Sequence, residues 1–350
     1  MAFTHRKLIG LLALLGLPIS FMIALAFGTI SIPFGDVIAS LVSSSSNAQS
    51  NLVVEQIRLP RATLAVIVGA LLGICGAATQ GLFRNPLADP SLIGVTAGAT
   101  VGSALTIFFS NQLLSLYSVS GIGLVSLGAF IGGALAVGLV YSLATSSAQG
   151  RAFSANGSTS VATMLLAGIA ITAIAGSITS LAEFFADNEA LRRISLWRMG
   201  GLDGANTERL GFGLLALLIV MICLPRYSTA LNALLLGESE ARHLGVAVQK
   251  TKLHIILLVA LGVAISVALA GSIAFVGLVI PHIIRLLIGP DHRWLLPMSA
   301  LGGAILLLLA DTLARTLFAP IELPVGLVTA LLGAPFFISL LRRRHDYGMR

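Results

Sequence analysis

The chain has few charged residues. Only 10% of its 350 residues are Asp, Glu, Lys or Arg, whereas 57% are apolar. A water-soluble domain carries about 25% charged residues, which cover its surface with solvated groups. Because this chain has too few of them for that, much of its surface is expected to face lipid. The composition therefore predicts an all-α membrane protein that crosses the bilayer several times.

Lysine is especially rare, and this excludes one source of energy. The chain holds three lysines, Lys7, Lys250 and Lys252. A nucleotide-binding P-loop needs a Gly-Lys-Ser/Thr core, and the nearest match is Lys250-Thr251, preceded by Gln249 instead of glycine. The chain is therefore not expected to hydrolyse ATP, and any uphill transport must be driven by a separate protein.

Cysteine and clustered histidine are also scarce. The two cysteines, Cys75 and Cys223, lie far apart inside apolar runs, which excludes a disulfide or metal framework. The six histidines are scattered, and none has the spacing of metal ligands. The serine run at 43–46 lies in a polar loop and does not resemble a nucleophile motif. We predict no catalytic residues, no metal site and no cofactor in this chain, so a membrane enzyme is disfavoured.

The apolar residues gather into runs close to the length that crosses a bilayer, about 20 residues. Ten such segments are expected, the first a retained helix and not a cleaved signal peptide. They fall near 8–28, 62–83, 92–110, 121–144, 161–185, 210–224, 253–271, 274–289, 294–318 and 324–341. No soluble domain flanks them, so residues 1–350 form a single transmembrane domain. Glycines three or four apart, as in 69–78 and 132–135, would let helices pack closely.

The basic residues give the orientation. The formal net charge is +7, but the Lys and Arg residues stand at the ends of apolar segments, which argues against nucleic-acid binding. With both termini in the cytoplasm, fourteen of the 21 lie inside, as the positive-inside rule expects. The other seven are Arg58, Arg61, Arg192, Arg193, Arg198, Arg209 and Arg315.

Two connections between the segments look structured. Around 188–200, apolar residues alternate with arginines, as in an amphipathic helix that lies at the periplasmic membrane surface. Around 228–246, helical apolar spacing is interrupted by Gly237 and Gly245, which predicts two short helices joined at a glycine.

Few ionisable residues lie inside the expected spans, and this weighs against an ion-driven carrier. Such a carrier usually keeps charged groups in the membrane for function. The candidates are Asp311, His282 and Arg285. We expect Asp311 to be hydrogen-bonded in helix packing and His282 to have a structural role beside Pro281. An ion-coupled secondary transporter remains an alternative, as does a membrane subunit with no transport pathway.

Several long blocks resemble a known family. RLPR at 58–61 and the Gly-rich block at 69–99 resemble the first half of the iron-complex and cobalamin permeases of ABC importers. The blocks at 237–245, 271–293, 306–316 and 322–337 resemble the second half. The blocks keep their order from about residue 50 to 341, so the resemblance covers nearly the whole chain.

The resemblance implies a type II ABC importer permease with ten helices per subunit. Its members work as homodimers in the bacterial inner membrane, with two cytoplasmic ATPase subunits that bind ATP and Mg²⁺ and a periplasmic substrate-binding protein. The loop at 228–246 would hold the coupling helices that contact the ATPase. The residues matching this motif are Leu236, Gly237, Glu238, Glu240, Ala241, Arg242, Leu244 and Gly245.

The resemblance also assigns roles at the two membrane faces. Arg58, Arg61 and Arg315 match the positions that pair with acidic residues of the binding protein. Arg suits bidentate contact with carboxylates. Interfacial anchoring is the alternative role for Arg58 and Arg61. Ser158, Thr159 and Ser160 match the cytoplasmic gate, although such a run is also a common helix N-cap.

The cargo is less well defined. The stretches at 182–205, 242–245 and 287–293 are most similar to members that import haem. Ferric siderophores and cobalamin remain alternatives, because no set of ligand-binding side chains can be identified from the sequence.

Overall fold

The computed structural model describes residues 2–42, 48–110, 121–149 and 161–347. Within these ranges the secondary structure is entirely helical. The expected gate residues Ser158, Thr159 and Ser160 lie outside the described residues.

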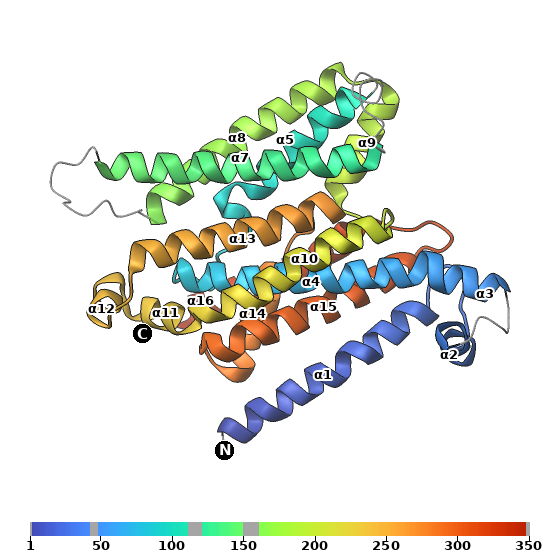
Figure 1. Cartoon of the computed structure of the whole chain (residues 1–350), viewed down its shortest axis with the longest axis horizontal. Coiled ribbons are helices and arrows are strands. Elements are labelled where there is room, and N and C mark those ends of the chain that lie inside the picture. The colour runs from blue at the N-terminus through green and yellow to red at the C-terminus, as the bar shows by residue number, and fades with distance from the viewer. Residues whose placement is uncertain (1, 43–47, 111–120, 150–160, 348–350) are drawn as a thin grey trace.

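The helices form a bundle whose long members run roughly in one direction (Figure 1). In chain order they are α1 (Ala2–Ala26), α2 (Phe34–Val42), α3 (Ala48–Leu52), the π-helix η1 (Val53–Arg58), α4 (Leu59–Leu82), the 3₁₀ helix η2 (Pro90–Ile93), α5 (Val95–Phe108), α7 (Gly121–Gln149), α8 (Val161–Phe185), α9 (Asn188–Met199), α10 (Thr207–Cys223), the 3₁₀ helix η3 (Leu224–Tyr227), α11 (Ser228–Leu236), α12 (Glu238–His243), α13 (Val248–Ala270), α14 (Val276–Ile288), α15 (His292–Thr316) and α16 (Val325–Tyr347).

Every predicted membrane segment coincides with a helix: α1, α4, α5, α7, α8, α10, α13, α14, α15 and α16. In the described part of the chain, seven helical spans are long and apolar enough to cross a membrane. Three further apolar helices are shorter, at Val95–Phe108, Val276–Ile288 and Val325–Ser339. The chain is thus an all-helical, multi-pass membrane protein, and the count of ten crossings stays a prediction. Helix α2 and the short α3 were not predicted.

Helix α4 lies at the centre of one part of the bundle and is buried along almost its whole length. It packs on α15, α13, α14 and α10. The α4–α15 contact is close because it consists of glycines: a side chain on Gly69 would collide with the carbonyl of Gly303, and one on Gly73 with the carbonyl of Ser299. In lipid, small residues of this kind allow helix backbones to approach.

Helices α5, α7 and α8 form a second layer, drawn above α13 in Figure 1. Glycines again set the distance, since Gly98 and Gly102 of α5 lie against Gly132 and Gly128 of α7. The stripes of glycine three to four residues apart in the sequence therefore mark two helix contacts, α4–α15 and α5–α7.

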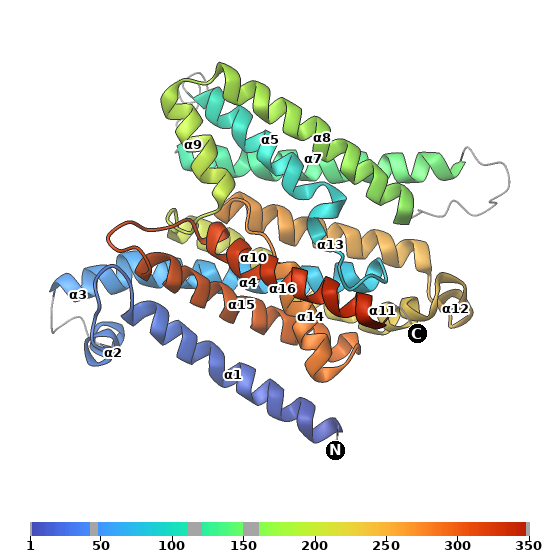
Figure 2. The same ribbon diagram turned by 180° about the vertical axis from the view of Figure 1, so that it is seen from behind.

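The two ends of the bundle differ. The first and last described residues lie toward the end that holds α11 and α12, whereas α2, α3 and α9 lie at the opposite end (Figures 1 and 2). We refer to these as the α12 end and the α9 end. Helix α9 covers the segment predicted to be amphipathic. Its start is fixed by Asp187, which caps the helix by accepting a hydrogen bond from the backbone N–H of Ala190 at 2.7 Å.

Candidate functional site

At the α12 end, two short helices are joined by a glycine that has no good substitute. Gly237 connects α11 to α12 at φ +132°, a backbone conformation that side chains disfavour. A side chain there would also meet the carboxylate of Glu240. The two short helices inferred from the sequence are therefore present, and they meet at Gly237, the glycine that interrupts the apolar spacing.

A second glycine ends α12. Gly245 has φ +85° and donates a backbone hydrogen bond to Arg242 O at 2.9 Å. The next residue, Val246, donates to Ala241 O at 3.0 Å. This pair of bonds is a Schellman motif, which satisfies the last carbonyls of a helix. Both ends of α12 are thus fixed by backbone geometry.

Helix α12 is also tied to the bundle. Lys252, in the second turn of α13, is buried, and its Nζ lies 2.5 Å from Oε1 of Glu238 at the start of α12. Ala241 is fully buried and belongs to the main hydrophobic core. The ion pair and the buried alanine join α12 to α13, so the two helices are expected to move together.

Helix α11 is tied to α15 in a similar way. Asn232 Nδ2 donates to Asp291 Oδ1 at 2.7 Å, and Asn232 Oδ1 accepts from the backbone N–H of His292 at 2.9 Å. Asp291 caps α15 through the N–H of Arg293. Burial alone would raise the pKa of Asp291, but the bonds from Asn232 and Arg293 and the charges of Arg293 and Arg6 outweigh it and hold the pKa below its ordinary value.

The outer face of these helices is exposed and partly apolar. The side chains of Leu236 and Leu244 are 68% and 65% exposed, beside the exposed Glu240 and Arg242. Large leucines among charged groups, on rigidly held helices at the end of the bundle, are typical of a protein–protein contact. We call Leu236, Glu240, Arg242 and Leu244 the coupling surface.

At the α9 end, the three arginines matched to the family lie close together, but they are buried. Arg58 and Arg315 reach the end of α1. Arg58 donates to Leu25 O at 2.6 Å and Ala26 O at 2.9 Å, and Arg315 donates to Ala24 O at 3.0 Å. Cations at the C-terminus of a helix satisfy its last carbonyls and favour its dipole. These two side chains therefore fix α1 to the end of η1 and to α15.

The third arginine lies in a cluster of carboxylates. Arg61 Nε donates to Asp311 Oδ1 at 3.0 Å, and its NH1 lies 2.6 Å from Glu322 and 2.9 Å from Asp203. Asp311 also pairs with Arg315 at 3.0 Å. Asp311 is thus hydrogen-bonded between packed helices, as we expected from the sequence.

The structure gives Arg58, Arg61 and Arg315 partners within the chain, with only 4–7% of each residue exposed. In this conformation they cannot reach a docked protein. The exposed groups of the cluster are the carboxylates, Asp203 at 73% and Glu322 at 36% side-chain exposure. A docking role for the arginines stays a prediction, and it requires Arg61 and Arg315 to leave the carboxylates and Arg58 to leave the end of α1. Interfacial anchoring is not what the structure shows for Arg58 and Arg61.

Between α5 and α8 lies a recess of about 360 Å³. Most of its polar lining is hydroxyl groups, with one cation. The lining includes Thr100, Thr172, Thr179, Ser180, Arg198 and Ser272. Weakly polar walls of this kind can pass a bulky solute without holding it tightly.

Comparison with known protein families shows which family the chain belongs to. The model of the FecCD transport family matches residues 16–343. The chain belongs to the FecCD transport family. A FecCD protein is the membrane permease of an ABC importer, and a separate ATPase drives it, working with a substrate-binding protein. This agrees with the missing P-loop.

Two relatives of known name are almost equally similar to this chain in sequence. The chain is 44% identical to the hemin transport system permease protein HmuU of Yersinia pestis, over 91% of this chain and 90% of that protein. It is 43% identical to the cobalamin import system permease protein BtuC of Halobacterium salinarum, over 84% of this chain and 74% of that one.

The fold of this FecCD permease is also found in a solved structure. An inward-facing structure of a metal-chelate type ABC transporter superposes with a TM-score of 0.82 at 33% identity, covering 96% of this chain and 99% of that one. The BtuC-like permease fold predicted from the sequence is confirmed.

Sequence reasoning missed the residues that hold these sites in place. Lys252, Asn232, Asp203 and Glu322 were not singled out, although each contacts a predicted residue or its helix. Lys252 alone had a local signal, since a lysine is rare in this chain and this one precedes a long apolar run.

Proposed function

We propose that this permease imports an iron complex, with haem as its cargo, from the periplasm into the cytoplasm. It would act as a homodimer in the bacterial inner membrane with two ATPase subunits that hold ATP and Mg²⁺. The observation that carries the transport part of the proposal is the coupling surface, which is exposed and partly apolar and is attached to two long helices by hydrogen bonds and an ion pair.

The attachments suggest how force would be transmitted. An ATPase bound to Leu236 and Leu244 would move α11 and α12. Because Asn232 bonds α11 to the start of α15 and Lys252 bonds α12 to α13, both long helices would follow as rigid bodies. Gly237, Glu238, Ala241 and Gly245 belong to the same predicted coupling segment, and they would hold α12 in the orientation in which it meets the ATPase.

The α12 end would face the cytoplasm and the α9 end the periplasm. The excess of Lys and Arg around the expected inner loops supports this, and it puts both termini in the cytoplasm. A substrate-binding protein would dock at the α9 end. Arg61 and Arg315 would reach its carboxylates only when their cluster with Asp311 opens, and Arg58 only when it leaves the last carbonyls of α1.

The pathway would lie beside α8. The hydroxyl-lined recess between α5 and α8 supports this, and Ser158, Thr159 and Ser160, which precede α8 in the sequence, would form the inner gate. The second copy would complete the passage.

The cargo rests on the relatives. The 44% identity to a hemin permease over 91% of the chain favours haem. Cobalamin is the second candidate because an almost equally similar relative carries that name. Ferric siderophores are the third candidate cargo.

The test is uptake by proteoliposomes that contain this permease, its ATPase and its binding protein. Haem, cobalamin and a ferric siderophore are offered in turn. We expect ATP-dependent haem uptake that survives collapse of ion gradients by ionophores. Uptake that needs a gradient and not ATP would contradict the proposal, and ATP-driven uptake of another chelate alone would contradict only the cargo.

The coupling surface is tested separately with Leu236→Glu and Leu244→Glu. Two new carboxylates in an apolar contact should abolish copurification of the ATPase. Met199→Glu is the matched control, because Met199 is also exposed but lies at the α9 end. Retention of the ATPase by the double variant would place the contact elsewhere.

A further inference from the structure

Two hollows follow each other along the seam between α7 and α13. The one nearer the α9 end has a volume of about 270 Å³ and is lined by Ile107, Val125, Arg193, Leu196, Trp197, Gly201, Asp203, Gly204, Arg209, Leu269, Ala270 and Gly271. The other has about 260 Å³ and an apolar lining of Phe130, Ala134, Val137, Gly138, Tyr141, Leu253, Ile256, Leu257, Ala260, Leu261 and Ala264. Neither hollow has a part in the proposed transport function.

The two hollows belong to one antiparallel helix contact. Helices α7 and α13 pack together. The hollow at the α9 end is lined by Val125 of α7 and Leu269 of α13, and the other by Phe130 to Tyr141 of α7 and Leu253 to Ala264 of α13, so residue numbers fall along α7 and rise along α13 toward the α9 end. From Phe130 to Tyr141 the apolar hollow extends about 16 Å at 1.5 Å per residue, close to the length of an acyl chain. It opens outward at Gly138, where an added side-chain carbon would meet nothing within 4 Å.

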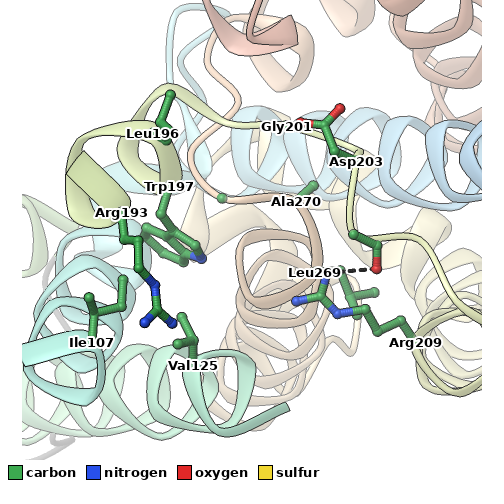
Figure 3. Close-up of a pocket in the computed structure, with 12 residues that line it drawn as sticks. Ile107, Val125, Arg193, Leu196, Trp197, Gly201, Asp203, Arg209, Leu269 and Ala270 are labelled. Carbon is green, nitrogen blue, oxygen red and sulfur yellow. Dashed lines mark hydrogen bonds between the residues drawn. The ribbon is translucent and has the colours of Figure 1, made fainter. Parts of the chain in front are cut away.

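The hollow at the α9 end carries uncompensated positive charge. Figure 3 shows Arg193 and Arg209 entering it from opposite sides. In the described part of the chain, neither arginine forms an ion pair. The one carboxylate in the lining, Asp203, points away from both and pairs with Arg61.

Arg209 is held in place by two hydrogen bonds, but one of its N–H groups has no acceptor among the described residues. Its NH1 donates to Gly204 O at 2.9 Å and its NH2 to Ser126 Oγ at 2.8 Å, whereas its buried Nε has no hydrogen-bond partner among the described residues. A buried guanidinium N–H without an acceptor is costly. Arg209 therefore contributes a positive charge to the lining of the pocket that no carboxylate of the described residues neutralises.

The pocket lies where the membrane interface is expected. Below it, α7 and α10 expose large apolar side chains, including Leu127, Leu135, Phe212 and Leu215. Trp197 lines the pocket, and tryptophan is common at the level of lipid headgroups. Phosphate groups of the surrounding lipids are therefore expected at this depth.

We propose that an anionic phospholipid binds in this seam. Its phosphate lies between Arg193 and Arg209, and one acyl chain fills the apolar hollow between α7 and α13. Two unpaired guanidiniums favour a headgroup with net negative charge over a zwitterionic one. The lipid would join α9, α7 and α13 on the outer side of the bundle.

The test is native mass spectrometry of the full permease, purified in mild detergent and supplied with phosphatidylglycerol or phosphatidylcholine. We expect one tightly retained phosphatidylglycerol per chain. Arg193→Gln should weaken its retention about tenfold, the cost of one hydrogen bond to a charged group. Arg192→Gln is the matched control, because that residue is exposed and lies outside the pocket.

The acyl groove is tested with Gly138→Phe, which should fill it and also weaken retention. Gly211→Phe on α10 is the control, since that glycine likewise has open space around it but lies outside the seam. Thermal unfolding of both variants without added lipid shows whether they fold like the wild type, so that a loss of folding is not mistaken for a loss of lipid retention.

Inorganic phosphate at matched concentration distinguishes a lipid from a free anion. If phosphate raises the unfolding temperature as much as phosphatidylglycerol and Gly138→Phe changes nothing, the pocket binds a free anion and the lipid proposal is wrong. Equal retention of both lipids, or retention unaffected by Arg193→Gln, would also overturn it.

Discussion

Arg61 of α4 and Asp311 of α15 stand 250 positions apart in the sequence and form a buried ion pair, with Arg61 NH2 at 3.0 Å and Nε at 3.0 Å from Asp311 Oδ1. Arg315 approaches the other carboxylate oxygen at 3.0 Å. One carboxylate thus serves two arginines whose remaining donors reach the end of α1 and the loop around Glu322. This arrangement makes Asp311 the centre of the α9 end.

Asp311→Asn should destabilise the permease strongly. It leaves two buried guanidiniums without their shared charge, and breaking a buried ion pair costs about 3–5 kcal/mol. Asp203→Asn is the matched control, because Asp203 also pairs with Arg61 but its side chain is 73% exposed, and an exposed pair contributes less than about 1 kcal/mol. Thermal unfolding in detergent measures both. Equal effects would mean that the cluster is solvated.

Gly69→Ala should separate α4 from α15. The added methyl group collides with the carbonyl of Gly303, and overpacking of this kind costs about 1–3 kcal/mol. Gly211→Ala on α10 has open space around it and should be neutral or gain up to about 1 kcal/mol from helix propensity. An unchanged unfolding temperature for Gly69→Ala would show that the close approach is not required.

Lys252→Met should uncouple ATP hydrolysis from transport. It removes the bond to Glu238 that joins α12 to α13, a loss of about 1.5–3 kcal/mol for a hydrogen bond between charged groups. We expect the ATPase to remain bound and active while uptake falls several-fold. Lys250→Met is the control, because Lys250 also lies near the start of α13, two residues before Lys252, but its side chain is exposed. If both variants transport normally, the Lys252–Glu238 bond has no role in coupling.

The attachment of α11 should weaken in acid. The pKa of Asp291 is held below its ordinary value of 3.8, so its contribution to stability is complete above that value and is lost as the pH falls through the lowered pKa. The difference in unfolding temperature between wild type and Asp291→Asn should therefore shrink at low pH. A difference that stays constant from pH 7 to pH 3 would contradict this.

Much of the fold was predictable because its signals are local. Apolar runs of membrane-spanning length gave all ten helices, including the short α5 and α14. Helical spacing broken at Gly237 gave α11 and α12, and the same kind of periodicity gave α9. Helix α2, over Phe34–Val42, was missed because nine residues between two polar stretches give too short a run to register as a span.

The roles of the arginines were not predictable to the same degree. Arg58, Arg61 and Arg315 lie at the ends of apolar runs, which suggested a surface position, yet each is buried by α1 or by carboxylates distant in the chain. The anchors Asn232 and Lys252 were also missed, because their value depends on Asp291 and Glu238 being beside them.

The sequence by itself determined that this chain is a multi-pass helical permease without its own ATPase site, because hydrophobicity, helical periodicity and motifs are properties of neighbouring residues. Only the tertiary structure decided which charges are buried, which leucines remain exposed at the α12 end, and where two arginines face an apolar seam. Those features arise when helices far apart in the sequence pack together, since the free energy of a charge depends on the groups that surround it in space.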